Sequence, residues 1–137
     1  MTDPAYVLVF GTRTFADFPL LCARLGAYTA DLGPLVVVHG EWRTIPYDDP
    51  RAVGADLLAM RWAETVRRCP HQPFPPEFEK HGRPAAFHVR NRDMVLFVAG
   101  RDNGFAVAFW DGESRGTAST IELCKRHHVP LKVVRCG

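Results

Sequence analysis

Residues 5–11 read AYVLVFG, a short apolar run that stops at a glycine. Successive side chains of a strand point to opposite faces, so the unbroken run from Ala5 to Phe10 places apolar groups on both faces. This pattern is typical of a central strand in a parallel sheet that is covered by helices on each side. The fold prediction starts from this strand and extends along the chain.

Strand-like and helix-like segments alternate after it. Apolar residues recur three or four positions apart between Phe18 and Tyr28, which predicts a helix over residues 15–32. Residues 70–84 contain five prolines and are expected to be mostly extended or irregular. The other predicted elements are a strand over 35–38, a helix over 52–68, an edge strand over 72–74, a helix over 84–99, a strand over 105–110, a helix over 117–127 and a strand over 130–134.

Residues 84–99 allow two interpretations. The run 94–98 is apolar enough for a strand, but Ala86, Val89 and Met94 keep helical spacing, which favours the helix. Arg90 lies on the same stripe, on the side expected to face the protein. An arginine in that place needs a partner or a ligand anion.

The alternation of strands and helices predicts an α/β fold. Short connections imply right-handed crossovers, a mostly parallel central sheet of about five strands and helices on both faces, that is, a three-layer α/β/α sandwich. We expect one domain over residues 1–137, with a polar loop excursion at about 41–53.

Composition excludes several classes of protein. The chain is 47% hydrophobic and 23% charged, which is ordinary for a soluble globular protein. A net charge of +2 without a basic run argues against a nucleic-acid partner, and no apolar run is long enough to cross a bilayer. Cysteines without metal-ligand spacing are expected to be reduced thiols, which with the lack of a signal sequence predicts a cytoplasmic location. The sequence predicts neither a metal nor a cofactor.

Glycine and polar residues follow three of the predicted strands. Ligands of such sheets bind at the carboxyl ends of the strands, where glycines let the backbone approach and helix N-termini favour anions. Ser114 and Thr117 would add hydroxyl donors, and Arg13 and Arg115 would add guanidinium groups for phosphate. Each corner taken alone could also be an ordinary turn that binds no ligand. The candidate ligand residues at these corners are Gly11, Thr12, Arg13, His39, Gly40, Gly54, Asp56, Gly112, Ser114, Arg115, Gly116 and Thr117.

The order of these motifs resembles the SLOG superfamily of Rossmann-like nucleotide-binding domains, and within it the YspA-type, cpYpsA-related branch. The resemblance covers nearly the whole chain. It is carried by GTRTF after the first strand, VVVHG after the second, GADLLAMRWA at the second helix, FPPEF with HGRPAAFHVRNRDM further on, and FWDGESRGT before the last helix.

The resemblance implies binding or sensing of a nucleotide-derived ligand, of the ribose phosphate or ADP-ribose type, at the strand ends. Gly112, Ser114, Gly116 and Thr117 would cradle the phosphate. Arg90 and Asn91 would occupy the place where relatives put an arginine beside the ribose phosphate. The superfamily also suggests a homodimer or larger homo-oligomer, to which Trp62 and Phe97 could contribute as easily as to the core.

The sequence departs from the family pattern in two places. Relatives run through a compact glycine-rich corner after the second strand, whereas here residues 41–53 intervene, with Trp42, Tyr47, Asp48 and Asp49. This loop could contact the ligand, act as a lid or be an inert excursion.

The second departure concerns catalysis. Lonely Guy enzymes of the superfamily cleave the bond between a base and ribose 5-phosphate with a glutamate that falls on Thr120 here. A threonine cannot replace a carboxylate in that chemistry. The alternative function is therefore an N-glycosidic hydrolase that uses Asp56 with Arg90. The DNA-processing relatives DprA/Smf suggest single-strand binding, which the near-neutral charge argues against.

Overall fold

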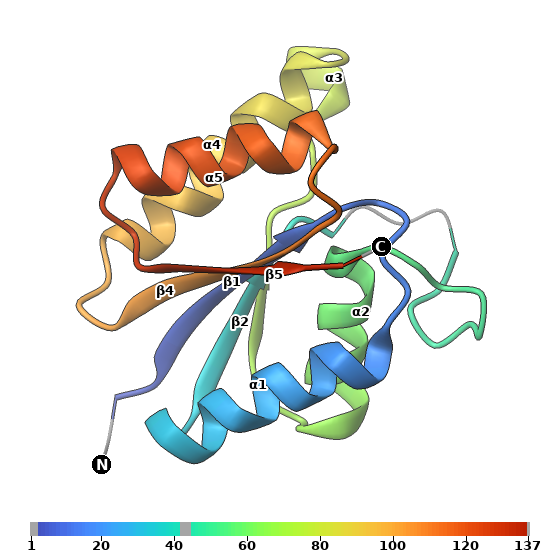
Figure 1. Cartoon of the computed structure of the whole chain (residues 1–137). Coiled ribbons are helices and arrows are strands. Elements are labelled where there is room, and N and C mark those ends of the chain that lie inside the picture. The colour runs from blue at the N-terminus through green and yellow to red at the C-terminus, as the bar shows by residue number, and fades with distance from the viewer. Residues whose placement is uncertain (1–2, 42–44, 137) are drawn as a thin grey trace.

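The computed structural model describes residues 3–41 and 45–136 and contains a five-stranded sheet in which every pair of neighbours is parallel. The strand order is β3-β2-β1-β4-β5. The predicted three-layer α/β/α fold with a parallel sheet is confirmed (Figure 1). The strands are β1 (Ala5–Gly11), β2 (Leu35–His39), β3 (His71–Pro73), β4 (Gly104–Trp110) and β5 (Leu131–Arg135).

Helices cover both faces of this sheet. In Figure 1, α1 and α2 lie on one face and α4 and α5 on the other. The helices are α1 (Phe18–Leu32), α2 (Ala55–Arg61), the π-helical turn η1 (Trp62–Val66), α3 (Phe78–His81), α4 (Ala85–Ala99) and α5 (Arg115–Arg126).

The central strand divides its side chains between two cores, as the AYVLVF run predicts. Val7 and Val9 of β1 pack into the core on the side of α1 and α2. Leu8 and Phe10 pack into the core on the side of α4 and α5. An unbroken apolar run is therefore needed here because neither face of β1 meets water.

Several element boundaries differ from the prediction. Helix α1 begins at Phe18 rather than residue 15, because the Asp17 side chain caps it by accepting from the Leu20 N–H at 3.1 Å. The helix expected over 52–68 begins at Ala55 and changes to π-helical hydrogen bonding at Trp62, where the Arg67 N–H donates to the Trp62 carbonyl at 3.0 Å. The one-turn helix α3 lies in the segment expected to be irregular.

Trp62 belongs to the core and not to a surface contact. Its side chain is 2% exposed and packs among the buried residues on the α1 and α2 side. Of the two roles that the sequence left open for Trp62, the structure supports the core. Phe97 is half-buried against Tyr6 and Phe74.

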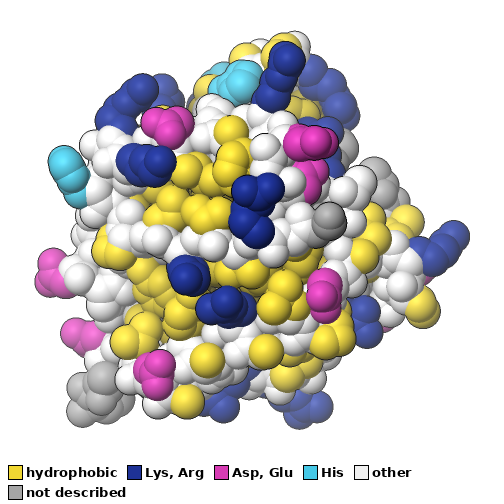
Figure 2. All heavy atoms as spheres, viewed as in Figure 1, with side chains coloured by type: hydrophobic (Ala, Val, Ile, Leu, Met, Phe, Trp, Pro, Cys, Tyr) yellow, Lys and Arg dark blue, Asp and Glu magenta, His cyan; other side chains and the backbone are white. Residues whose placement is uncertain are grey.

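Strand β5 forms one edge of the sheet. Figure 2 shows Lys and Arg side chains among apolar ones on the face where β5 lies. Lys132 and Arg135 are exposed on this strand. Such charges on an edge strand disfavour pairing with the edge of another sheet.

The chain leaves the two central strands in opposite directions. From β1 it passes to α1 on one face, and from β4 it passes to α5 on the other. The carboxyl ends of β1 and β4 therefore form the switch point at which open α/β sheets bind ligands.

All four cysteines are free thiols, and no helix in the described part of the chain is long and apolar enough to span a membrane.

Candidate functional site

A small cavity lies at this switch point, between the carboxyl end of β1, the start of α2, the first half of α4 and the start of α5. We call it the rim cavity. Its volume is about 90 Å³. Its lining residues are Phe10, Gly11, Arg13, Asp56, Phe87, Arg90, Asn91, Met94, Ser114, Gly116, Thr117 and Thr120.

The corner after β1 contributes Gly11 and Arg13 to the cavity. A Cβ at Gly11 would overlap the Phe109 carbonyl of the neighbouring strand, so pairing with β4 already requires glycine here. Thr12 points to the other side: its hydroxyl accepts from the Asp111 N–H at 3.1 Å, and it lines a separate hollow. Of the three candidate residues at this corner, Gly11 and Arg13 therefore line the rim cavity and Thr12 does not, and Arg13 supplies the positive charge.

The corner after β4 is held by Asp111, whose Oδ1 accepts from the Ser114 N–H at 2.8 Å and from the Glu113 N–H at 2.9 Å. These bonds to the charged form lower the pKa of Asp111, the bond from Ser114 most strongly. The Ser114 carbonyl also accepts from the Trp110 indole N–H at 3.0 Å. Asp111 is therefore tied up in shaping the turn and lies outside the rim cavity.

The first turn of α5 faces the rim cavity. The Ser114 and Thr117 hydroxyls lie 3.1 Å apart, and the N-cap Ser114 makes no side-chain bond to the helix backbone. The N–H groups of Gly116 and Thr117 belong to the first turn and so have no acceptor within the helix. Amides, hydroxyls and the positive end of the helix dipole thus meet on one wall of the cavity.

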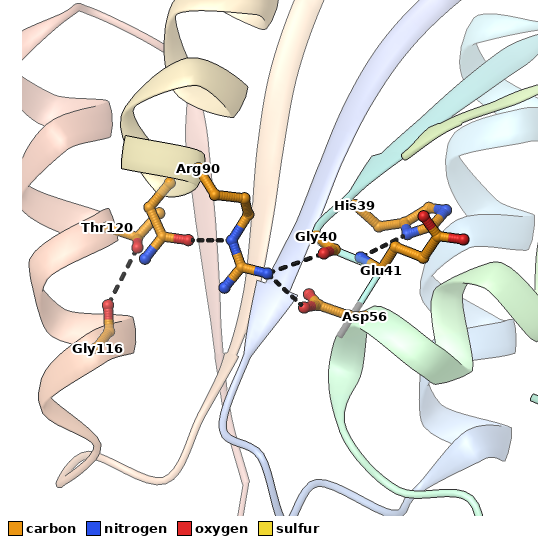
Figure 3. Close-up of polar contacts among 8 residues, drawn as sticks. His39, Gly40, Glu41, Asp56, Arg90, Gly116 and Thr120 are labelled. Carbon is orange, nitrogen blue, oxygen red and sulfur yellow. Dashed lines mark hydrogen bonds and ion pairs between the residues drawn. The ribbon is translucent and has the colours of Figure 1, made fainter. Parts of the chain in front are cut away.

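Arg90 extends from α4 toward Gly40 and Asp56, as Figure 3 shows, and lines the rim cavity. Its Nη1 donates to the Gly40 carbonyl at 2.9 Å, and its Nε donates to Asn91 Oδ1 at 2.9 Å. Nη1 also lies 3.6 Å from Asp56 Oδ2. Burial lowers the pKa of Arg90, the charge of Asp56 opposes this and the nearby charge of Arg13 adds to it. Hydrogen bonds therefore hold the Arg90 guanidinium in place, but the single carboxylate nearby compensates its positive charge only in part.

Gly40 and Gly54 support the site without lining it. A Cβ at Gly40 would overlap the Arg90 guanidinium and come close to Asp56, so this glycine makes room for their pairing. Gly54 has a φ of 100°, which favours glycine, and its N–H donates to the Phe15 carbonyl at 2.6 Å just before α2. Both glycines fix the positions of other groups.

His39, Gly112 and Arg115 do not reach the rim cavity. His39 is 0% exposed and shares a 2.9 Å hydrogen bond with His71. Gly112 has a φ of 87° and lies against the Arg135 guanidinium. Arg115 is exposed and is not among the residues that line the cavity. Glycine, histidine and arginine at strand ends therefore did not all indicate the same site.

Four lining residues were not among the predicted ligand residues: Phe10, Phe87, Met94 and Thr120. The Phe87 ring has the guanidinium carbons of Arg13 at 4.7 Å and of Arg90 at 5.4 Å from its centroid. The sequence did contain a signal for two of these residues: Phe87 and Met94 share one face of α4 with the predicted ligand residue Asn91, at the spacing i, i+4, i+7. Thr120 is buried and donates to the Gly116 carbonyl at 3.0 Å.

The loop excursion is anchored to the body of the protein. Ile45 and Tyr47 pack against the core on the α1 and α2 side. Asp49 accepts from Arg51 at 3.0 and 2.9 Å, and these side-chain bonds lower the pKa of Asp49 to about 2. None of these residues lines the rim cavity, and Trp42 lies outside the described residues.

The lining of the rim cavity carries more positive than negative charge. Two arginines and one carboxylate line it, a net charge of +1, and Asp56 is the only carboxylate of its lining among residues 3–41 and 45–136. Within the same described ranges, no three His, Cys, Asp or Glu side chains lie close enough to hold a metal ion.

Comparison with known proteins agrees with the resemblance seen in the sequence. The model of the family described as YspA, cpYpsA-related SLOG matches residues 5–81, which is more than half of the chain. The match runs from β1 to α3 and includes Arg13 and Asp56, while Arg90 and the start of α5 lie beyond it. No curated protein and no solved structure matches the chain. The chain therefore belongs to the YspA, cpYpsA-related SLOG family, and this membership indicates, broadly, a nucleotide-related function.

Proposed function

We propose that this protein binds or senses a nucleotide or nucleotide-derived ligand, of the ribose phosphate or ADP-ribose type, and holds its phosphate in the rim cavity. One observation carries the proposal: Arg13 from the corner after β1 and Arg90 from α4 converge with the first turn of α5 on one cavity. Planar guanidinium groups, helix-start amides and hydroxyls together are the donors that phosphate oxygens accept from.

The charge balance of Arg90 supports an anionic ligand. Arg90 is 10% exposed, and its carboxylate partner is 3.6 Å away, longer than a normal charge-assisted hydrogen bond. A second guanidinium, that of Arg13, adds repulsion. A phosphate between the two arginines would remove that repulsion and replace lost solvation.

The test is binding measured by calorimetry and by thermal shift. Inorganic phosphate, ribose 5-phosphate, AMP and ADP-ribose are compared with adenosine, which has the base and ribose but no phosphate. We expect the phosphate-bearing compounds to bind and to raise the Tm, and adenosine to bind far more weakly. If no phosphate-bearing compound binds, the proposal is wrong.

A matched pair of variants locates the binding. Arg13→Gln removes a guanidinium that lines the cavity, and Arg115→Gln removes one that does not, both from exposed positions. We expect Arg13→Gln to weaken phosphate-ligand binding about tenfold or more, which corresponds to about 1.4 kcal/mol. Arg115→Gln should change it by less than about twofold, because its charge is screened by solvent. Equal losses for both variants would show that general positive charge, and not the rim cavity, attracts the ligand.

A second candidate function is hydrolysis of an N-glycosidic bond, favoured by the position of Asp56. Asp56 lines the cavity and lies beside Arg90, so a carboxylate is available where a ribose would sit next to the phosphate. Thr120, at the place of the missing glutamate, uses its hydroxyl on the Gly116 carbonyl. The wild type would release free base from AMP, detected by chromatography, and Asp56→Asn would abolish that release. Binding without release supports the sensing function alone.

A further inference from the structure

The rim cavity is too small for a whole nucleotide. Its volume of about 90 Å³ compares with about 300–1,000 Å³ for pockets that enclose drug-sized ligands. If the proposed function holds, the rest of the ligand must lie outside the cavity. The question is which neighbouring surface receives it.

A larger hollow of about 370 Å³ adjoins the rim cavity, between the end of β3 and α4. We call it the β3–α4 hollow. Arg90 lines both spaces. On α4, Val89 and Asp93 face the hollow, whereas Phe87 and Asn91 face the rim cavity. The two spaces therefore lie on adjacent faces of one helix, with Arg90 at their border.

The chemistry of this hollow suits a flat ring that carries hydrogen-bond donors. Pro73 and Phe74 supply apolar surface from the end of β3, and Ala86 and Val89 supply it from α4. Asp93 contributes a carboxylate whose side chain is 46% exposed and whose Oδ1 lies 3.8 Å from Arg92 Nε, and Glu77 contributes a second, exposed carboxylate. An ionised carboxylate only accepts hydrogen bonds, so it selects a group with N–H donors over one without.

These features differ from those of the rim cavity, which gathers donors for an anion. A sugar phosphate alone would use the rim cavity and leave the apolar wall of the hollow exposed. A nucleoside monophosphate with an amino-bearing base offers both halves: an anion, and a flat aromatic ring whose faces can pack on apolar surface and whose amine donates hydrogen bonds.

We propose that the β3–α4 hollow is the base-binding subsite of this protein and that its ligand carries an amino-bearing base, such as adenine, on the ribose phosphate. This inference rests on the proposed function, because the phosphate is placed in the rim cavity. Arg90 separates the two subsites and contacts the ligand where ribose joins phosphate.

The test compares ligands that differ in the base alone. Calorimetry on the full chain would give affinities for ribose 5-phosphate, AMP and purine riboside 5′-monophosphate, which lacks the exocyclic amine. We expect AMP to bind at least about tenfold tighter than ribose 5-phosphate. Equal affinities of the wild type for these two compounds would overturn the inference and leave the phosphate site standing.

Variants then locate the base. Val89→Phe narrows the hollow, together with a separate hollow between α4 and α5 that Val89 also lines, and Leu96→Phe makes the same kind of enlargement at an exposed position of α4 that lines none of these spaces. Val89→Phe should reduce the preference for AMP over ribose 5-phosphate to nearly onefold with ribose 5-phosphate affinity unchanged. Leu96→Phe should leave both affinities unchanged. An AMP preference that survives in Val89→Phe contradicts the assignment.

Asp93→Asn tests the subsite without a change of volume and is also informative if Val89→Phe misfolds. It should reduce the preference for AMP over purine riboside 5′-monophosphate, and the double variant with Glu77→Gln, which also removes the second carboxylate of the hollow, should abolish that preference. A preference for AMP that the double variant leaves intact contradicts the role of these carboxylates.

Failure of the two proposals is distinguishable. If no phosphate-bearing compound binds, the proposed function fails. Adenosine binding that Val89→Phe abolishes would then still support the hollow as a base site, and absence of adenosine binding would overturn it too.

Discussion

Two corners at the same edge of the sheet follow β2 and β4, the strands on either side of β1, and they differ in how their polar groups are used. The corner after β2 contains His39, Gly40 and Glu41, and the corner after β4 runs from Asp111 to Thr117. Both combine glycine with polar side chains. The first is closed by hydrogen bonds within the protein, and the second presents hydroxyls and amides to the rim cavity.

The closed corner is a chain of hydrogen bonds that begins in the core. The Glu41 N–H donates to His39 Nδ1 at 3.1 Å, so the neutral His39 ring carries its proton on Nε2. That nitrogen lies 2.9 Å from His71 Nδ1, and His71 Nε2 lies 2.6 Å from Glu64 Oε1. Each ring thus donates outward, from the buried His39 to the exposed Glu64. Polar residues that satisfy one another in this way need no ligand.

The comparison predicts that His39 is a structural residue. His39→Ala removes a fully buried ring and leaves the Glu41 N–H and His71 Nδ1 without it. We expect a loss of about 2–4 kcal/mol in the free energy of unfolding, measured by urea denaturation. The control His88→Ala, at an exposed position of α4, should change it by less than about 0.5 kcal/mol. A His39→Ala variant of normal stability that no longer binds ligand would instead place His39 in the site.

Gly40 links the corner after β2 to the rim cavity through Arg90, and its substitution gives the next largest effect. Gly40→Ala would push the Arg90 guanidinium out of place without removing its charge. We expect affinity for AMP to fall about tenfold, since phosphate binding depends on the orientation of the guanidinium. Calorimetry would measure this, with Gly26→Ala as the control, because a Cβ at Gly26 in α1 meets no neighbour. Unchanged affinity in Gly40→Ala would mean that the held position of Arg90 is unimportant for the ligand.

The smallest effect concerns Asp111, which holds the open corner. Its pKa is lowered in the folded protein, so its contribution to stability is present above the ordinary value of 3.8 and is lost as the pH falls through the folded pKa. Asp111→Asn should therefore be slightly less stable than the wild type at pH 7, and the difference should vanish in strong acid. Thermal unfolding from pH 7 to pH 2 would show this, with Asp48→Asn as an exposed control. A difference that persists at pH 2 would rule out the charge of Asp111 as its cause.

The order of strands and helices could be predicted because it follows from local patterns. The AYVLVF run and the spacing from Phe18 to Tyr28 each specify an element without reference to the rest of the chain. The predicted element boundaries were wrong where individual hydrogen bonds determine where a helix begins. The Asp17 cap makes α1 start later than predicted, and the one-turn helix α3 forms inside a proline-rich segment that was expected to be irregular.

The candidate site was only partly predictable. Arg13, Asp56 and Arg90 meet as their places after strands and on a helix stripe suggested, because parallel strand ends share one edge. Arg115 and Ser114 are adjacent in sequence, yet one faces water and the other the cavity. No periodic signal separates them, because that choice depends on where α5 begins.

The sequence by itself determined the layers of this protein, since apolar periodicity controls which faces must be buried and therefore how strands and helices stack. It also supplied the residue types that an anion site requires. The tertiary structure alone decided which of them remain available to a ligand: His39 found its partners in His71 and the Glu41 N–H, while Ser114, Thr117 and Arg13 converge on open space. The physical reason is that hydrogen bonds between distant segments are satisfied or left open by folding, and no short stretch of sequence encodes that outcome.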